Sequence, residues 1–392
     1  MLITQQQAGE DTTALQSEFD AYIETTTDEE ARRYFKRMED ADPEAVAVWK
    51  RFRDLSIEKM NKTYARLNIH YDDYSGESQV KQSSMDLGAK LLEEKNVSSR
   101  DEGAVMVDFV ALGFKKLEKA TVVKKDGTTL YLTRDIGAAQ ERHDKYNFDK
   151  MIYVVASQQD LHFKQLFKIE ELIGREHIAK KCEHINFGMV SGMSTRRGTA
   201  KFLDDILKDV GDKMHEVMRS NAAKYEQVED PDKTADILGI SAVMVQDMSG
   251  KRINGYDFDM DRMCSFEGDT GPYLQYAHAR LCSIMRRVNV PEHELVDTDL
   301  APLYDSKHAV DLIRTLSQWP DVFVNTLKTQ EPVTVLTYLF KMTHVLSSSY
   351  EHLQVVGSEE TVLRARLALY AAARGVLGNG MRLLGLSPVE RM

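Results

Sequence analysis

The segment GMSTRRG, Gly192 to Gly198, combines two arginines with hydroxyl side chains and glycines. It follows a run typical of a strand and precedes a helical pattern, so its N–H groups, hydroxyls and guanidiniums could converge on phosphates. Arginine suits this role because its planar guanidinium matches phosphate oxygens. A solvated basic loop is the alternative. The candidate residues here are Met193, Ser194, Thr195, Arg196 and Arg197.

The segment YLTRD places Tyr131 and Asp135 four residues apart. If a helix begins just after a strand, both side chains can converge at the carboxyl end of that strand. A carboxylate there would bind a cation, and a guanidinium best, because the pair can be bidentate. The alternative is a first-turn acid that stabilises the helix dipole.

The segment ASQQDLH follows a short apolar run, and its Gln159 and His162 fall where ligands bind at the edge of a parallel sheet. Helix capping by Gln158 or Asp160, with His162 packed on the first turn, explains the same residues. Further on, GPYLQYAHAR spaces Tyr273 and Tyr276 three apart on a predicted helix, with Arg280 nearby. Such a face could stack unpaired bases, although paired aromatics are more often core.

The elements that would position these residues change in type along the chain. Residues 1–70 are predicted to be mainly helical, with first-turn acids at Asp28, Glu29 and Glu30 and a second helix from Asp42-Pro43. Two β-rich runs around Asp126-Gly127 predict a hairpin, and a helix follows over 135–145. A strand over 151–157, a helix over 160–173 and a strand over 184–190 form a βαβ unit, which predicts a doubly wound sheet.

Beyond Lys201 the pattern is helical. An amphipathic helix is predicted over 202–225, and GDTGP at 268–272 interrupts the pattern and marks a domain entry. The remaining helices are expected over 273–287, 306–318, 331–353 and 359–377, the last one ending at Gly378-Asn379-Gly380, as an all-α bundle. The fold class is therefore α/β plus all-α, divided into 1–200, a helical connection at 201–267, and 268–392.

Bulk composition excludes several classes of protein. The 392 residues contain no apolar run that could span a bilayer and no signal-peptide pattern at the start. The three cysteines are far apart, which argues against a zinc site or disulfides and fits a reducing compartment. The net charge is −11, of which residues 1–45 contribute −8, so the rest of the chain is nearly neutral and can still present a basic face.

These segments, in this order, resemble the arginyl-tRNA synthetases, and the eukaryotic cytoplasmic, fungal-type branch in particular. The matching stretches run from about residue 30 to Met392: ARRYFKRMED, YSGESQV, DGTTLYLTRDIGAA, YVVASQQDLHF, NFGMVSGMSTRRGT, GISAVMVQDMSGKRIN, FEGDTGPYLQYAHAR and RLLGLSPVERM. The resemblance implies a Rossmann-type class I catalytic domain followed by a helical anticodon-binding domain of the DALR type, the motif being RLAL at 366–369.

The resemblance also implies a reaction and a set of roles. Arginine is activated with ATP, which would be used with Mg²⁺, and is then transferred to tRNA(Arg). Tyr131, Asp135 and Gln159 fall on arginine-binding positions, and His162 and Ser194 on ATP-binding ones. Residues 193–197 correspond to the Lys-Met-Ser-Lys-Ser loop, although Gly192 stands where the class usually has its first lysine. Residues expected to contact tRNA are Tyr273, Tyr276, Arg280 and Met392.

The class also carries a His-x-Gly-His signature near the start of its Rossmann domain, and this sequence contains none. We therefore expect an N-terminally truncated chain whose incomplete Rossmann domain lacks its first βα unit, and which binds tRNA without charging it. The expected protein is a cytoplasmic monomer, with a mitochondrial form as an alternative location. Neither a resident metal, nor DNA, nor a membrane is expected as a partner. The rival functions are a non-catalytic tRNA-binding protein and a structural subunit of a synthetase complex.

Overall fold

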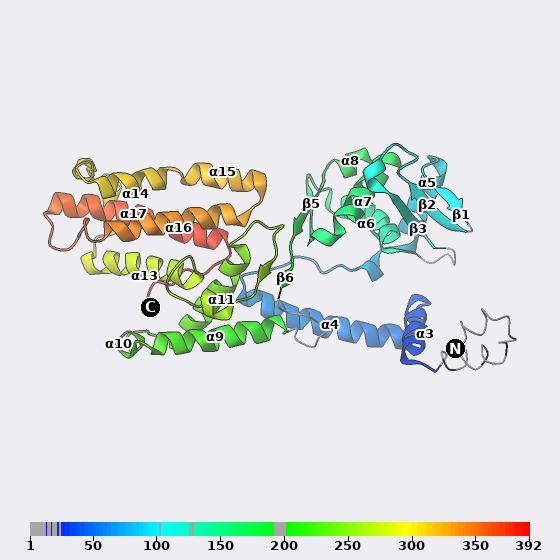
Figure 1. Ribbon diagram of the computed structural model, residues 1–392, viewed down its shortest axis with the longest axis horizontal. Helices are drawn as coiled ribbons and strands as arrows, with labels where there is room; N and C mark the ends of the chain where they lie inside the picture. Colours follow the sequence, from blue (N-terminus) through cyan, green and yellow to red (C-terminus); the bar gives the residue numbers. More distant parts are fainter. Residues whose placement is uncertain are drawn as a thin grey trace, which may run out of the picture. The chain divides into compact units, whose positions relative to one another are not determined.

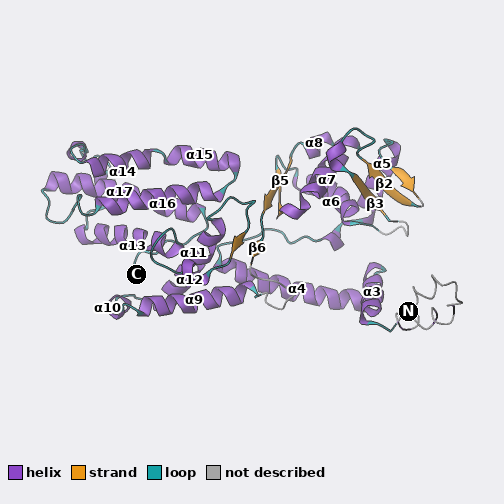
Figure 2. Cartoon of the chain, viewed as in Figure 1, coloured by secondary structure: helices purple, strands orange, loops and turns teal. Residues whose placement is uncertain are grey.

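The computed structural model describes residues 25–101, 103–124, 129–191 and 201–392, together with the single positions 13, 17 and 22. Contacts divide the chain into two compact units, Met1–His70 and Tyr71–Met392. Helices dominate both units, and the strands are few and short (Figure 2). The boundaries after residues 200 and 267 stay predictions.

The first unit contains helices α3 (Thr27–Glu39) and α4 (Pro43–Arg66). The predicted first-turn acids lie in α3 and Pro43 opens α4, as expected. Along α4 the apolar side chains of Phe52 and Leu55 are exposed.

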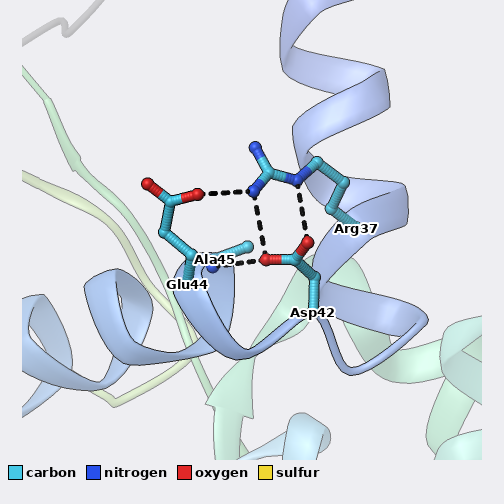
Figure 3. Close-up of polar contacts among 4 residues, drawn as sticks. All are labelled: Arg37, Asp42, Glu44 and Ala45. Atoms are coloured by element: carbon cyan, nitrogen blue, oxygen red, sulfur yellow. Dashed lines mark hydrogen bonds and ion pairs between the residues drawn. The ribbon is translucent and has the colours of Figure 1, made fainter.

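A fork of hydrogen bonds fixes the corner between α3 and α4 (Figure 3). Arg37 donates to Asp42 and, over 3.0 Å, to Glu44, while Asp42 caps α4 by accepting from the backbone N–H of Ala45 at 2.9 Å. The Ala45 hydrogen bond, followed by the Arg37 contact, lowers the pKa of Asp42.

The second unit begins with a small α/β region. Helix α5 (Gln82–Glu94) precedes an antiparallel sheet in which β2 (Ala104–Asp108) lies between β1 (Ser99–Asp101) and β3 (Lys119–Val123). Helix α6 (Tyr131–Tyr146) then precedes β4 (Met151–Ala156), α7 (Asp160–Leu172), the short α8 (Glu176–Ala179) and β5 (Cys182–Phe187). Strands β4 and β5 pair in parallel, so the predicted βαβ unit is confirmed.

Two predictions about this region are wrong in detail. The predicted hairpin keeps only its first strand, because Tyr131 begins a helix and the second arm is reduced to a single bridge between Val123 and Thr129. The hydroxyl of Thr133 explains this: it accepts the Leu130 N–H at 3.2 Å and donates to the Val122 carbonyl, which closes the start of α6 and ties it to β3.

The strand over 151–157 was expected to be buried, yet Val154 is 66% exposed and Ile152 is also exposed. One face of β4 packs on α7 through Tyr153 and Phe163. Within the described residues β4 and β5 form a two-stranded sheet and not a wide doubly wound one. A short separate pair, β6 (Val190–Ser191) with β7 (Tyr256–Asp257), takes the last residues of the predicted second strand.

The rest of the unit is helical. The predicted helix over 202–225 breaks at Ser220 into α9 (Leu203–Arg219) and α10 (Ala222–Tyr225), and α11 (Pro231–Met248) packs on α9. After α12 (Met260–Met263) come α13 (Gly271–Val288), α14 (Lys307–Ser317), α15 (Trp319–Thr329), α16 (Pro332–Ser349) and α17 (Glu360–Leu383). Helices α14, α16 and α17 lie side by side (Figure 1) around a large apolar core.

Helix α17 does not end at the Gly378–Gly380 stretch as predicted, but continues to Leu383. These glycines serve close packing between helices. A Cβ at Gly380 would lie 2.6 Å from the side chain of Leu339 on α16, and one at Gly378 would lie 3.1 Å from His278 Nε2 on α13. The glycines that predict a helix end in the sequence therefore allow helices to approach closely in the fold. The predicted helix over 331–353 ends earlier, at Ser349, and α15 was not predicted as a separate helix.

Candidate functional site

Asp135 and His162 meet between two helices. Asp135 lies on the second turn of α6 and His162 on the first turn of α7, and Asp135 Oδ2 is 2.7 Å from His162 Nε2. The side chains are 27% and 21% exposed, so the pair is reachable from solvent. The second carboxylate oxygen of Asp135 can therefore accept a hydrogen bond from a cationic ligand.

Tyr131 and Gln159 occupy the entrances to these two helices. Tyr131 is the first residue of α6 and is 67% exposed, and because Asp135 follows one turn later the two side chains share a helix face. Gln159 ends the short 3₁₀ turn Ser157–Gln159 after β4 and is also exposed. The structure thus brings Asp135 and His162 into contact and leaves Tyr131 and Gln159 exposed at element ends. The predicted phosphate-binding residues Met193, Ser194, Thr195, Arg196 and Arg197 lie outside the described residues.

A second candidate site is a groove in the helical region. Its volume is about 770 Å³, and it is bounded by α13, by the end of α16 and by residues near the end of the chain. Four arginines line it: Arg280, Arg286, Arg287 and Arg391. Tyr276 and Met392 line it too, so three of the four residues predicted to contact tRNA converge here.

Tyr273 does not join them. Its hydroxyl lies 3.2 Å from Ser347 Oγ and its ring packs on His344, 5.8 Å between centroids. Two tyrosines three residues apart on α13 therefore have different surroundings, and their shared role as a platform for bases stays a prediction. Tyr276 remains 37% exposed at the groove.

The floor of the groove contains a stacked cation. The guanidinium carbon of Arg280 lies 3.8 Å from the ring centroid of Tyr350. Burial raises the pKa of Tyr350 strongly, so its hydroxyl stays protonated. That hydroxyl is buried and has no hydrogen-bond partner among the described residues. The floor therefore presents a flat cation stacked on a buried tyrosine ring.

Two family models match the chain. "tRNA synthetases class I (R), catalytic domain" matches residues 11–260, and "DALR anticodon binding domain" matches residues 274–392. The chain belongs to the class I arginyl-tRNA synthetase family. The predicted fold class, an α/β catalytic region with a helical anticodon domain, is thereby confirmed.

Named relatives and solved structures agree with this family. The chain is 58% identical over 371 residues to "Arginine--tRNA ligase, cytoplasmic" of Saccharomyces cerevisiae, covering 94% of this chain and 61% of that protein. It is 56% identical to "Probable arginine--tRNA ligase, cytoplasmic" of Schizosaccharomyces pombe, covering 93% of this chain and 58% of the relative. The chain thus spans about three fifths of the length of these relatives.

The arginyl-tRNA synthetase of Plasmodium falciparum superposes with a TM-score of 0.80 at 22% identity, over 98% of this chain and 64% of that one. The Thermus thermophilus enzyme gives 0.75 at 20% identity, over 91% and 67% of the two chains. At such low identity the likeness establishes the fold alone.

Polar contacts that the sequence did not predict surround α6, the helix of this synthetase-family chain that carries Asp135. Arg134, next to Asp135, donates to Glu77 of the SGESQV turn at 3.1 Å. Glu141, further along α6, accepts from the N–H of Lys81 at 2.9 Å and from the hydroxyl of Ser84 at 2.6 Å, at the start of α5. The turn at residues 75–80 is therefore packed against α6.

A buried ion pair lies behind the same helices. Glu170 on α7 is 1% exposed and sits 3.4 Å from Arg175, which also donates to the carbonyl of Ile136. Burial raises the pKa of Glu170 to about 7, and Arg175 opposes that shift. One carboxylate oxygen of Glu170 has no partner among the described residues, which makes the pair sensitive to protonation.

Among the described residues, no three His, Cys, Asp or Glu side chains lie close enough together to hold a metal ion. No described helix is long and apolar enough to cross a bilayer. A larger cavity of about 920 Å³ lies among α11, α12 and α16, and none of the predicted site residues lines it.

Proposed function

We propose that the chain acts in arginine–tRNA ligation, binding arginine at Asp135 and tRNA(Arg) in the arginine-lined groove. The observation that carries the proposal is the convergence of Arg280, Arg286, Arg287, Arg391 and Tyr276 on one groove of the DALR domain. Guanidiniums neutralise phosphates and aromatic rings stack unpaired bases, and an anticodon loop presents both.

Arginine recognition rests on the carboxylate of Asp135. One oxygen of Asp135 contacts His162, and the other is proposed to pair with the guanidinium. Tyr131 and Gln159, at the entrances of α6 and α7, are proposed to add oriented hydrogen bonds. A site built for a guanidinium rejects neutral side chains because its carboxylate would otherwise stay desolvated and unpaired.

The proposed chemistry has two steps. The carboxylate of arginine attacks the α-phosphorus of ATP, forming arginyl-adenylate and releasing pyrophosphate. A hydroxyl of the terminal tRNA ribose then attacks the arginyl carbonyl, and AMP leaves. Mg²⁺ would accompany ATP as part of the nucleotide substrate, because the described residues form no metal cluster of their own.

For ATP, Ser194 together with Arg196 and Arg197 is proposed to stabilise charge on the departing pyrophosphate. The assignment of His162 to ATP stays a prediction, and its contact with Asp135 adds a role in the arginine pocket. Replacing Arg196 and Arg197 with alanine is expected to lower kcat more than it raises KM for arginine. We further propose a cytoplasmic location, after the two yeast relatives named above.

The decisive experiment is tRNA binding by purified residues 1–392. We expect transcribed tRNA(Arg) to bind with an affinity that falls as salt is added, and a double Arg280→Ala, Arg287→Ala variant to lose most of it. Unchanged affinity in that variant would overturn the groove assignment. Arginine incorporation in the same preparation separates a ligase from the alternative, a non-catalytic tRNA-binding protein.

A further inference from the structure

The segment Ser387–Met392 is a strap that crosses α13 after α17 has ended. Helix α17 stops at Leu383, and Gly385 takes a positive φ of 81°. The N–H of Leu386 reaches back to the carbonyl of Met381 at 2.9 Å, which is the Schellman arrangement that turns a chain away from its helix. The strap therefore leaves α17 in a defined direction.

One buried amide on α13 grips the strap at two points. Gln275 is 0% exposed, and its Nε2 donates to the carbonyl of Ser387 at 2.9 Å. Its Oε1 accepts from the N–H of Val389 at 2.8 Å, and the same Nε2 also donates to Ser241 on α11. The amide is thus fully used between α11 and the strap.

Two more side chains of α13 continue the contact. His278, one turn after Gln275 and 5% exposed, donates from Nδ1 to the carbonyl of Val389 at 2.8 Å. Arg286 donates to the carbonyl of Glu390 at 2.9 Å. The strap therefore receives hydrogen bonds along three turns of one helix, and its Val389 side chain is buried.

The strap ends inside the arginine-lined groove. Arg391 and Met392, which follow the clamped residues, line that groove beside Tyr276 and Arg280. Met392 also packs against the apolar cluster formed by α9, α11 and α12. Helix α13 thus carries two adjacent stripes: Gln275 and His278 face the strap, while Tyr276 and Arg280 face the groove.

An apolar side chain at position 275 would pack α13 without the cost of burying an amide. Two of the three hydrogen bonds of Gln275 instead fix a segment with no regular secondary structure of its own. We propose that Gln275 and His278 are positioning residues for tRNA binding: through the strap they hold Arg391 and Met392 as one wall of the groove. This inference rests on the proposed function, because it presupposes that the groove binds RNA.

The test compares Gln275→Met with a matched control, Tyr338→Phe. Both changes remove hydrogen bonds of a buried side chain in the helical domain, but the Tyr338 hydroxyl donates to Thr315 and touches no part of the strap. Amide hydrogen exchange of residues 386–392 reports the strap directly, without RNA. Filter binding of tRNA(Arg) reports the groove, at a temperature where thermal melting shows both variants folded.

We expect Gln275→Met to speed exchange at Val389 and to weaken tRNA binding by about 3- to 10-fold, the range of one or two lost hydrogen bonds. Tyr338→Phe should lower the melting temperature without either effect. In a chain that also carries Arg391→Ala and Met392→Ala, Gln275→Met should weaken binding by less than about twofold more, because the wall it positions is already removed.

Faster exchange with unchanged tRNA affinity would overturn the positioning role, and unchanged exchange would show that these hydrogen bonds do not hold the strap. Arg280→Ala separates these failures from failure of the proposed function. If that variant binds tRNA normally, the groove itself is not the RNA site, whereas the exchange measurement still reports on the clamp.

Discussion

The Asp135–His162 pair and the arginine-lined groove are supported by different kinds of structure. Asp135 and His162 stand on two helices over a two-stranded sheet, and β4 of that sheet leaves Val154 66% exposed. The groove stands on α13, whose Leu274 and Leu281 are fully buried within the large core of α14, α16 and α17. Both sites rest on buried apolar residues, because α6 and α7 contribute Ile136 and Leu166 to the core of the α/β region. The sites differ in what stands above that core: the first is one polar contact between two helices, and the second is a groove lined by several arginines. Substitutions at Asp135 should therefore change binding alone, whereas substitutions on α13 should separate into packing and binding effects.

The largest effect is expected from Asp135→Asn. Removing the carboxylate charge proposed to pair with the guanidinium should weaken arginine binding by ~2–4 kcal/mol, as for a lost desolvated charge pair. Titration calorimetry with arginine measures this. Asp144→Asn, on the exposed side of the same helix, is the control. Arginine affinity within a few-fold of the parent chain in Asp135→Asn would show that the guanidinium binds elsewhere.

Tyr276→Ala comes next. Loss of a base–aromatic stack should cost ~1–3 kcal/mol in tRNA affinity, while the melting temperature changes little because the ring is 37% exposed. Tyr273→Ala is its counterpart on the same helix: it breaks contacts to Ser347 and His344 and should lower stability more than affinity. If Tyr276→Ala instead lowers the melting temperature strongly and leaves tRNA affinity unchanged, Tyr276 is a core residue.

Arg280→Ala should weaken tRNA binding by about 1–2 kcal/mol, because it removes both a phosphate partner and the cation stacked on Tyr350. The slope of log affinity against log salt should also fall by about 0.7–0.9. Arg364→Ala, an arginine of α17 that pairs with Glu360, serves as control. An unchanged salt slope would remove Arg280 from the phosphate contacts.

The two regions should also respond oppositely to pH. Glu170 has its pKa raised to about 7 by burial, so between about pH 4.5 and 7 the folded chain binds more protons than the unfolded chain. Its contribution to stability is present at low pH and is lost as the pH rises through about 7, on the order of 1–3 kcal/mol. Urea unfolding from pH 5 to 8 should show this slope, and Glu170→Gln should flatten it. A slope that persists in that variant belongs to another group.

His278 is the weaker test, with the opposite sign. Burial, reinforced by Arg374 and Arg382, lowers the pKa of His278. Its contribution is present above the ordinary histidine pKa and is lost as the pH falls below it, because the unfolded chain takes up the proton first. Acidification from pH 7 to 5 should loosen the strap, seen as a lower protection factor at Val389 once the measured exchange rate is divided into the intrinsic rate at each pH. His278→Gln should show no such pH dependence, and an equal response in both chains would exclude His278 as its source.

The sequence predicted much of this arrangement, and the misses have physical causes. The βαβ unit and the helices after Lys201 follow from apolar periodicity, which survives in the fold. The run TLYLT looks like a strand, but the hydroxyl of Thr133 caps a helix that begins at Tyr131. Local propensity cannot register that tertiary hydrogen bond to β3.

Contacts between side chains that lie far apart in the sequence could not be predicted either. The sequence placed Asp135 and His162 at one sheet edge, but their 2.7 Å contact depends on how α6 and α7 pack. No sequence pattern pointed to Gln275 and His278, because their partners lie more than a hundred residues away at Ser387 and Val389. Tyr276, Arg280 and Met392 are expected to contact tRNA from family likeness, and all three line one groove although they come from two separate stretches, α13 and the end of the chain.

Gly378 connects α17 to the proposed tRNA-binding groove through its close contact with His278. A single methyl group there would lie 3.1 Å from His278 Nε2 and equally close to Arg382, so the imidazole would have to move. The displaced ring would pull on the Val389 carbonyl and, through it, on the last two residues of the wall. By helix propensity alone, Gly378→Ala would be expected to stabilise α17. Through His278 and the strap, however, the substitution should weaken the proposed tRNA binding, although position 378 lies outside the groove.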